Sequence, residues 1–150
     1  MRNEIAVILV AAFVVLLVFY FATAKGERKK ISIINPEGFK VSVDVELADN
    51  LTTRAKGLMG RKSLGEYEGM LFVFDELGFH SFWMVNTTIP LDAIFIDENG
   101  TVVDIIKMEP CSLLNCQLHT PKEKAKYVLE VNKGFSQRHK IEEGSRLMME

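Results

Sequence analysis

The stretch IPLDAIFIDENGTVVDIIKM, residues 89–108, carries the strongest fold signal in this chain of 150 residues. Two runs rich in β-branched side chains flank four polar residues that end in Asn99-Gly100. Asn-Gly is frequent in tight hairpin turns because both residues tolerate a positive φ. The stretch therefore predicts an antiparallel β-hairpin, from which the rest of the fold is worked outward.

Four further strands are expected around this hairpin. Residues 40–47 alternate apolar and polar side chains, which is typical of a half-buried strand. Short apolar or β-branched runs, typical of strands, occupy residues 69–76, 126–132 and 145–149.

Helical segments are expected to be few and short. A cap at Asp49 or Asn50 predicts a helix that ends near Gly60. Its apolar side is expected to be formed by Leu51, Ala55 and Leu58. One or two helical turns are predicted over residues 133–140.

Strands outnumber helices, and short hairpin connections dominate. This predicts a mainly β (α+β) domain over residues 31–150, an antiparallel barrel-like or sandwich structure with one or two short helices. The composition, 48% hydrophobic and 25% charged, is that of an ordinary globular domain. A formal net charge of −2 gives no general attraction for a phosphate backbone, so no nucleic-acid partner is expected.

The N-terminal residues 1–24 differ sharply from this domain. Residues 5–23 carry no charge, and a run of about 20 apolar residues spans a bilayer as a helix. A cleaved signal peptide is an alternative because an Ala-x-Ala site ends at Ala24, and a buried soluble helix is a third. The length favours an uncleaved transmembrane anchor, followed by a basic linker over residues 25–30.

The orientation of this anchor depends on two opposing signals. Basic residues follow the apolar run, which by the positive-inside rule would keep the domain in the cytoplasm. Cys111 and Cys116 are the only cysteines, and such a pair suits a disulfide in an oxidising compartment. Free buried thiols, or a metal site with His119 completed by Glu109 or Asp104, are the alternatives. The disulfide is favoured, and no metal or cofactor is predicted.

Polar side chains interrupt the apolar segment just before the hairpin. Alternation places Asp92 on a face that it shares with Ile94 and Ile96, so its carboxyl group is expected to be buried. A buried carboxylate must be paired or hydrogen-bonded. Asp92 is therefore interpreted as a structural clamp that ties the turn at residues 86–90 to the helix, or as a ligand-binding or catalytic carboxylate. The partners considered are Arg54, Arg61, His80, Asn86 and backbone N–H groups before Pro90.

A short strand from Phe79 to Met84 is also predicted. It would place His80 beside an aromatic floor made by Phe82 or Trp83, and such floors suit sugars and planar ligands. A satisfied core or rim histidine is the alternative for His80.

Several motifs together resemble a known family. RAKGLMGRKSL, EGMLFVF, HSFWMVNTTIPLDAIFID, EPCSLLNCQ and AKYVLEVNKGFSQRHKIEEGSRL occur in the order seen in the family called domain of unknown function 192. The resemblance covers roughly residues 40–149. It implies a small β-rich, barrel-like domain, often preceded by a signal or anchor, with no established biochemical role.

The resemblance also marks individual residues. The family pattern falls on Arg54, Gly57, Leu58, Met59, Arg61, Gly69, Met70, Phe82, Trp83, Met84, Asn86, Pro90, Leu91, Asp92, Cys111, Cys116, Tyr127, Glu130, Asn132 and Gly134. This chain departs from it at Val85, where the family usually has Lys, which weakens a charged-ligand hypothesis. His119 replaces a commonly aromatic position.

Together these observations predict a single-pass cell-membrane protein whose domain lies outside the cytoplasm. The leading function is a binding module for a polar, for instance carbohydrate, ligand or for an envelope protein. The candidate ligand-binding residues are His80, Trp83, Asn86, Asp92, Arg54 and Glu130. The alternatives are a hydrolase that uses Asp92 or Glu130 with His80, and a structural envelope protein without a ligand site.

Overall fold

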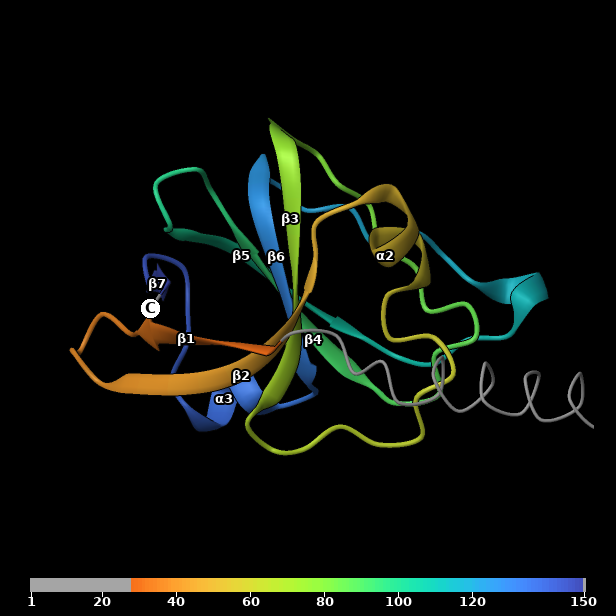
Figure 1. The fold of residues 1–150 in the computed structure, drawn as a ribbon, viewed down its shortest axis with the longest axis horizontal. Helices are drawn as coiled ribbons and strands as arrows, with labels where there is room; N and C mark the ends of the chain where they lie inside the picture. The colour runs from red at the N-terminus through yellow and green to blue at the C-terminus, as the bar shows by residue number, and fades with distance from the viewer. Residues whose placement is uncertain (1–27, 150) are drawn as a thin grey trace, which may run out of the picture.

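The predicted hairpin forms one end of a seven-stranded sheet in the computed structural model, which describes residues 28–149 (Figure 1). Strands β4 (Leu91–Ile96) and β5 (Val102–Met108) pair antiparallel, as expected. In the turn, the Asp97 carboxylate accepts hydrogen bonds from the N–H groups of Asn99 at 2.9 Å and Thr101 at 2.8 Å. Gly100 adopts a φ of +79°, which explains the glycine at this position.

The sheet has the order β5-β4-β6-β3-β2-β1-β7. The remaining strands are β1 (Arg28–Ile34), β2 (Lys40–Ala48), β3 (Glu68–Gly78), β6 (Ala125–Asn132) and β7 (Arg146–Met149). The two strands of the hairpin and the four further strands predicted around it are thus confirmed. Strand β1 was not predicted and begins within the expected linker. All pairs are antiparallel except β2 with β3, which run parallel.

The two edges of this sheet meet at one point. A bridge joins Thr101, just before β5, to Arg146 of β7, and the Leu147 N–H donates to the Gly100 carbonyl at 2.7 Å. The sheet is therefore curved and partly closed, in agreement with the barrel-like prediction rather than with a two-sheet sandwich.

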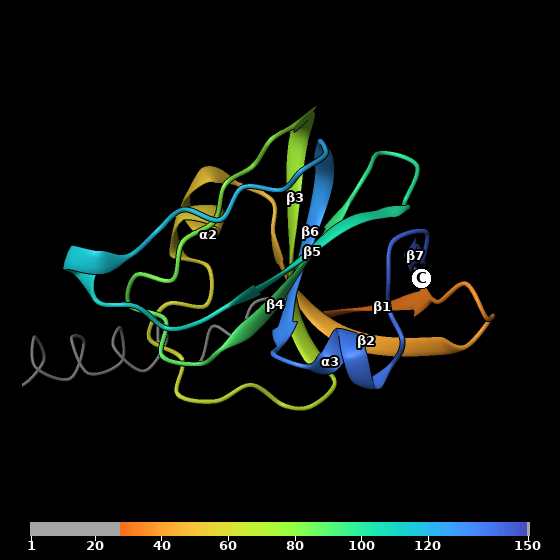
Figure 2. The same ribbon diagram turned by 180° about the vertical axis from the view of Figure 1, so that it is seen from behind.

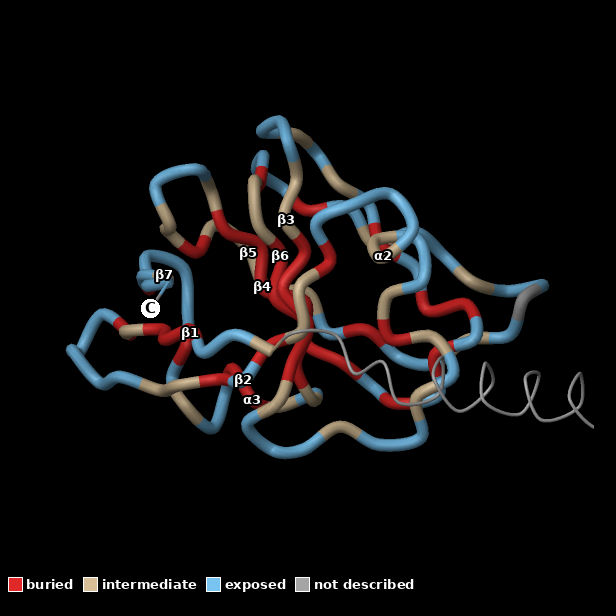
Figure 3. Tube along the Cα trace, viewed as in Figure 1, coloured by how far each residue is buried: buried red, intermediate tan, exposed pale blue. Residues whose placement is uncertain are grey.

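Each face of the curved sheet carries its own apolar core, which Figure 3 shows as buried stretches in the middle strands. We call the core that contains Leu91 and Phe95 of β4 the outer core. The core on the other face, which contains Ile94 and Ile96 of the same strand, is the inner core. This explains why β4 is buried along its whole length.

The short helix α3 (Phe135–Arg138) lies near β4 at one end of the sheet (Figure 2). Its Phe135 is fully buried and belongs to the inner core. Asp92, also fully buried, holds the start of α3. Its carboxylate accepts hydrogen bonds from the Gly134 N–H at 3.1 Å and the Ser136 N–H at 3.0 Å. Asp92 is thus a clamp, but it clamps α3 to the sheet and does not tie the turn at residues 86–90 to the first helix.

The first helix, α2 (Leu51–Lys56), departs from its prediction. Asn50 caps it with a reciprocal bond to Thr53, as expected, but it ends before Gly57 rather than near Gly60. Leu51 and Ala55 are exposed, and only Leu58, beyond the helix, is buried. The expected apolar side is therefore wrong, because this six-residue helix has a capping box but no buried residue.

The predicted strand from Phe79 to Met84 is also not formed. Only Phe82 makes a β-bridge there, exchanging backbone hydrogen bonds of 2.9 and 2.7 Å with His119. His119 lies on the loop that carries the short helix η1 (Leu113–Asn115) and is closed by the Cys111–Cys116 disulfide. The predicted disulfide is present, with Cα atoms 5.1 Å apart.

The membrane prediction falls on residues 1–24, which lie outside the described chain. Within residues 28–149, no helix has the length and apolar composition that crossing a bilayer requires.

We expect Asp92→Ala to lower the free energy of unfolding by about 3 kcal/mol, because it leaves buried N–H groups unpaired. Chemical denaturation followed by circular dichroism measures this. Asp75→Ala is the control, since the Asp75 side chain is 90% exposed, and it should change stability by less than about 0.5 kcal/mol. Equal effects of the two substitutions would contradict the clamp.

Removal of the disulfide by Cys111→Ser with Cys116→Ser should cost about 2 kcal/mol, because the closed loop is short. Intact-mass analysis after alkylation of the unreduced protein should show no labelled thiol. Two labelled thiols in the folded, unreduced protein would contradict the disulfide.

Candidate functional site

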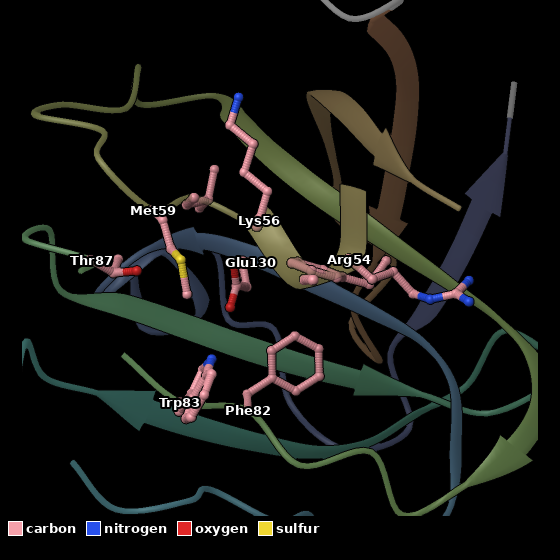
Figure 4. A pocket seen from close by; sticks show the side chains of 11 residues that line it. Arg54, Lys56, Met59, Phe82, Trp83, Thr87 and Glu130 are labelled. Carbon is pink, nitrogen blue, oxygen red and sulfur yellow. The ribbon is translucent and has the colours of Figure 1, made fainter. Parts of the chain in front are cut away.

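The candidate site is a small pocket on the outer face of the sheet, above Glu130 of β6. Alternation along β6 places Glu130 on the same face as Val128, which belongs to the outer core. Glu130 is only 4% exposed. It is the one carboxyl group among the residues that line this pocket (Figure 4).

Three segments build the walls. The first is the end of α2 and its following loop, the second is the segment around Phe82 to Thr87, and the third is Phe72 of β3. The Gly60 N–H donates to the Asn86 carbonyl at 2.9 Å, and the Thr88 hydroxyl donates to the Arg61 carbonyl at 3.0 Å. These bonds hold two walls together although the segments lie far apart in the sequence.

Two glycines permit close packing, Gly69 between β3 and β6 and Gly57 at the end of α2. A Cβ atom on Gly69 of β3 would lie 2.7 Å from the Glu130 carbonyl oxygen, so only glycine fits beside the strand that carries Glu130. Gly57, which ends α2, has a φ of +48° that favours glycine.

The Glu130 carboxyl group has no charged partner. No hydrogen bond or ion pair joins its side chain to another described residue, and burial alone raises its pKa to about 8. Glu130 is therefore neutral at pH 7, and a protonated carboxyl group both donates and accepts a hydrogen bond.

Arg54 lines the pocket but directs its charge elsewhere. Its guanidinium donates to the carbonyl oxygens of Asp49 at 3.0 Å and Val73 at 2.8 Å. Figure 4 shows the guanidinium extending away from Glu130. The cation therefore supports the α2 wall and does not neutralise Glu130.

Aromatic groups form the other side of the pocket. Phe82 is buried and packs edge-on against Phe72 at a centroid distance of 4.9 Å. Trp83 is 53% exposed, so its ring lies at the rim. The pocket has a volume of about 40 Å³, which is room for a few waters or one small polar group.

A second cavity of about 310 Å³ adjoins this pocket and shares Lys56, Gly57 and Met59 with it. Of its charged lining residues, Glu46 and Arg61 are paired with each other, whereas Lys56 is exposed. The Glu46 carboxylate accepts hydrogen bonds from Arg61 and, at 3.3 Å, from Arg28. The hydrogen bond from Arg61 is the main reason that the pKa of Glu46 is lowered.

The structure brings together three of the six predicted site residues, Arg54, Trp83 and Glu130. His80 does not line the pocket. Its ring stacks on Phe74 at 3.5 Å, and its Nε2 lies 3.1 Å from the Glu76 carbonyl oxygen. Asn86 is exposed with a φ of +56°, and Asp92 lies on the opposite face of the sheet.

Sequence reasoning missed Met59 and Thr87 as members of the pocket. Thr87 is only 6% exposed although it lies between two exposed polar residues. No periodicity marks such loop positions. The glycines that flank Met59 were the available signal, since they indicate a tight loop that approaches another segment.

The fold and the pocket define a class of small proteins with a partly closed, mainly β domain and a buried acid beneath a loop-built pocket. Within this class, the chain belongs to the family described as DUF192, Uncharacterized ACR, COG1430, whose model matches residues 33–149. The resemblance found in the motifs is thus confirmed.

Individual relatives agree with this assignment. A UPF0127 protein of Pyrococcus abyssi is 33% identical over 108 residues, which cover 69% of this chain and 83% of that protein. A UPF0127 protein of Pyrococcus furiosus is 30% identical over 116 residues, which cover 74% of this chain and 90% of that protein.

A crystal structure from Sinorhizobium meliloti, described as a putative transcription regulator, has a TM-score of 0.79 and 33% sequence identity. The match covers 84% of this chain and 96% of that one, so that relative forms this fold almost without further segments. A protein of unknown function from Novosphingobium aromaticivorans has a TM-score of 0.77 and 30% identity, over 84% of this chain and 88% of that one.

Burial of Glu130 makes the stability of the domain dependent on pH. Since its folded pKa of about 8 lies above the ordinary value of 4.5, the folded state binds more protons than the unfolded state between these pH values. The free energy of unfolding should therefore fall by several kcal/mol as pH rises from 4.5 to 8.

Comparison of the wild type with Glu130→Gln isolates this effect, because the amide has nearly the same shape and does not titrate. Denaturation at several pH values should show that the free energy of unfolding falls more steeply with pH in the wild type than in Glu130→Gln. This difference in slope should end near pH 8. Parallel pH profiles for the two proteins would contradict a buried, neutral Glu130.

Proposed function

We propose that the protein is a binding module that takes an uncharged, hydroxyl-bearing ligand in the Glu130 pocket. The observation that supports this most directly is the neutral carboxyl group of Glu130, which faces a small pocket and has no described partner. A buried polar group without a partner costs free energy, and a ligand hydroxyl would supply the missing hydrogen bond.

The surrounding residues suit a sugar or polyol. Trp83 presents an exposed ring at the rim, and such a ring packs against the apolar face of a sugar. Arg54 is held by carbonyls and Arg61 by Glu46, so an anionic ligand would have to break existing bonds to reach either guanidinium. Lys56 is exposed and extends its ammonium group away from Glu130 (Figure 4).

The adjoining cavity over Met70 gives the ligand room to extend. Its volume of about 310 Å³ lies at the lower end of the range for small-molecule sites. One ligand group would enter the narrow pocket over Glu130, and the remainder would lie in the wider cavity.

A hydrolase that uses Glu130 with His80 is less well supported. A carboxyl group with a pKa of about 8 could serve as a general acid near neutral pH. His80, however, is stacked on Phe74 outside the pocket, and the two oxygens of Asp92 accept hydrogen bonds from Gly134 and Ser136. No other carboxyl, imidazole or thiol group is among the residues that line the Glu130 pocket.

The place of action is part of the same proposal. The apolar run at residues 5–23 supports a membrane anchor, and the Cys111–Cys116 disulfide supports an oxidising compartment outside the cytoplasm. Protease accessibility of the domain in intact cells or spheroplasts tests this topology, and protection that ends only on lysis would overturn it.

Ligand binding can be followed through Trp83, the single tryptophan of the chain. Titration with monosaccharides, oligosaccharides and polyols should produce a saturable change in its fluorescence for at least one compound. Binding should weaken roughly tenfold per pH unit above about 8, because ionised Glu130 no longer donates a hydrogen bond.

Two variants sharpen this test. Glu130→Gln keeps a donor and should bind without the loss at high pH, whereas Glu130→Leu should abolish binding. His80→Ala is the matched control and should bind like the wild type. Loss of binding in the control, or retention in Glu130→Leu, would assign the ligand to a different place.

A further inference from the structure

The inner face of the curved sheet has an open end that the Glu130 pocket does not involve. Alternation along β1 places Lys29 on the same face as Ile31 and Ile33, which are 2% and 0% exposed. Lys29 pairs in register with Val45, which is also fully buried on the inner face. An exposed lysine therefore continues a row of inner-core residues and lies at the mouth of the sheet interior.

This mouth is a cavity of about 310 Å³. Its walls come from five strands and are mainly apolar, formed by Ile31, Leu47, Leu71, Val73, Tyr127 and Met149. Leu47, Val73 and Tyr127 are only partly buried, although they pack against the inner core. The cavity is thus an extension of the apolar core that opens to solvent.

The other end of the interior is covered by α3. Phe135 and Ile141 are buried in the inner core there, and Asp92 fixes the start of α3. A ligand that enters beside Lys29 therefore meets an apolar surface that becomes fully buried with depth, first Val73 and then Leu71 at 1% exposed.

The polar groups at the mouth favour an anion. Lys29 and Lys30 lie there with one carboxylate, that of Asp49, which already accepts a hydrogen bond from the Asn50 amide at 3.2 Å. Within residues 28–149, no hydrogen bond or ion pair engages the Lys29 ammonium group. A free cation above an apolar cavity is complementary to an acid with an apolar tail.

We infer that this mouth binds a single-chain aliphatic carboxylate, with the chain among Leu47, Val73 and Tyr127 and the carboxylate at Lys29. The volume fits one medium-length chain and is too small for a two-chain lipid. This site lies on the opposite face of the sheet from Glu130 and shares no lining residue with the Glu130 pocket, so the inference does not rest on the function proposed above. Only Leu47 also lines the wider cavity that adjoins that pocket.

The test uses decanoate, below its micelle concentration, and a fragment of residues 25–150. The crystallised Sinorhizobium relative, 96% of which is covered by the match, shows that this fold forms almost without further segments. Two-dimensional NMR of the ¹⁵N-labelled fragment should show saturable shifts at Leu47, Val73 and Tyr127, and none at Glu130.

Head-group and chain controls separate the two parts of the site. Decanol should bind at the same residues but more weakly than decanoate, and decyltrimethylammonium should bind more weakly still. Lys29→Gln should weaken decanoate binding at least fivefold without changing decanol binding. Lys62→Gln, which removes an exposed lysine that does not line the mouth, should have no effect.

Val73→Trp should fill the cavity and abolish binding of both decanoate and decanol. If this variant does not fold, Lys29→Gln still decides the matter, because it changes only an exposed side chain. The inference is overturned if decanoate gives no saturable shifts, or if its shifts lie away from the mouth. Equal binding of decanoate and decyltrimethylammonium, or no change in Lys29→Gln, would also overturn it.

Discussion

The bond between the Asp92 carboxylate and the N–H groups of Gly134 and Ser136 is the constraint on which the other features depend. It fixes α3 against the inner core and fixes the end of β6, the strand that carries Glu130. In the register of β4 with β6, Asp92 pairs with Val131 and Ala93 pairs with Glu130. Two buried acids therefore lie in adjacent register positions on opposite faces of the sheet.

The carboxyl groups of these two buried acids differ in their hydrogen bonding. Asp92 receives hydrogen bonds from backbone donors and serves the fold. Glu130 receives none from described residues, and burial raises its pKa to about 8. A buried polar group that has no hydrogen-bond partner within the fold is typical of a position used for binding or chemistry. This contrast separates the structural carboxyl group from the functional candidate.

The sequence allowed the hairpin, most strands and the burial of Asp92 to be predicted, because each depends on local alternation or turn chemistry. The parallel pairing of β2 with β3 could not be predicted, since it depends on how α2 and its loop return the chain. The segment from Phe79 to Met84 has the composition of a strand, but tertiary contacts use only Phe82 for pairing. Local sequence patterns therefore predicted the strands of the sheet but not the structure of the loops that cover it.

The candidate site was predictable only in part for the same reason. Trp83 and Glu130 were identified, but His80 was grouped with them by closeness in sequence, and the structure stacks it on Phe74 instead. Thr87 enters the pocket through a loop whose path is set by hydrogen bonds between distant segments, such as Gly60 with Asn86. Sequence spacing carries no information on such contacts.

The pairing of β1 with β7 has a consequence for biosynthesis. These strands lie at opposite ends of the described chain, and β7 also meets the turn that precedes β5. The inner core cannot be sealed on that side until β7 has left the ribosome, so Ile31 and Ile33 remain uncovered while the intervening chain is translated. Such long-range closure is entropically costly and slow, so the apolar strand edges of the nascent domain stay exposed for longer than in a fold with local pairing.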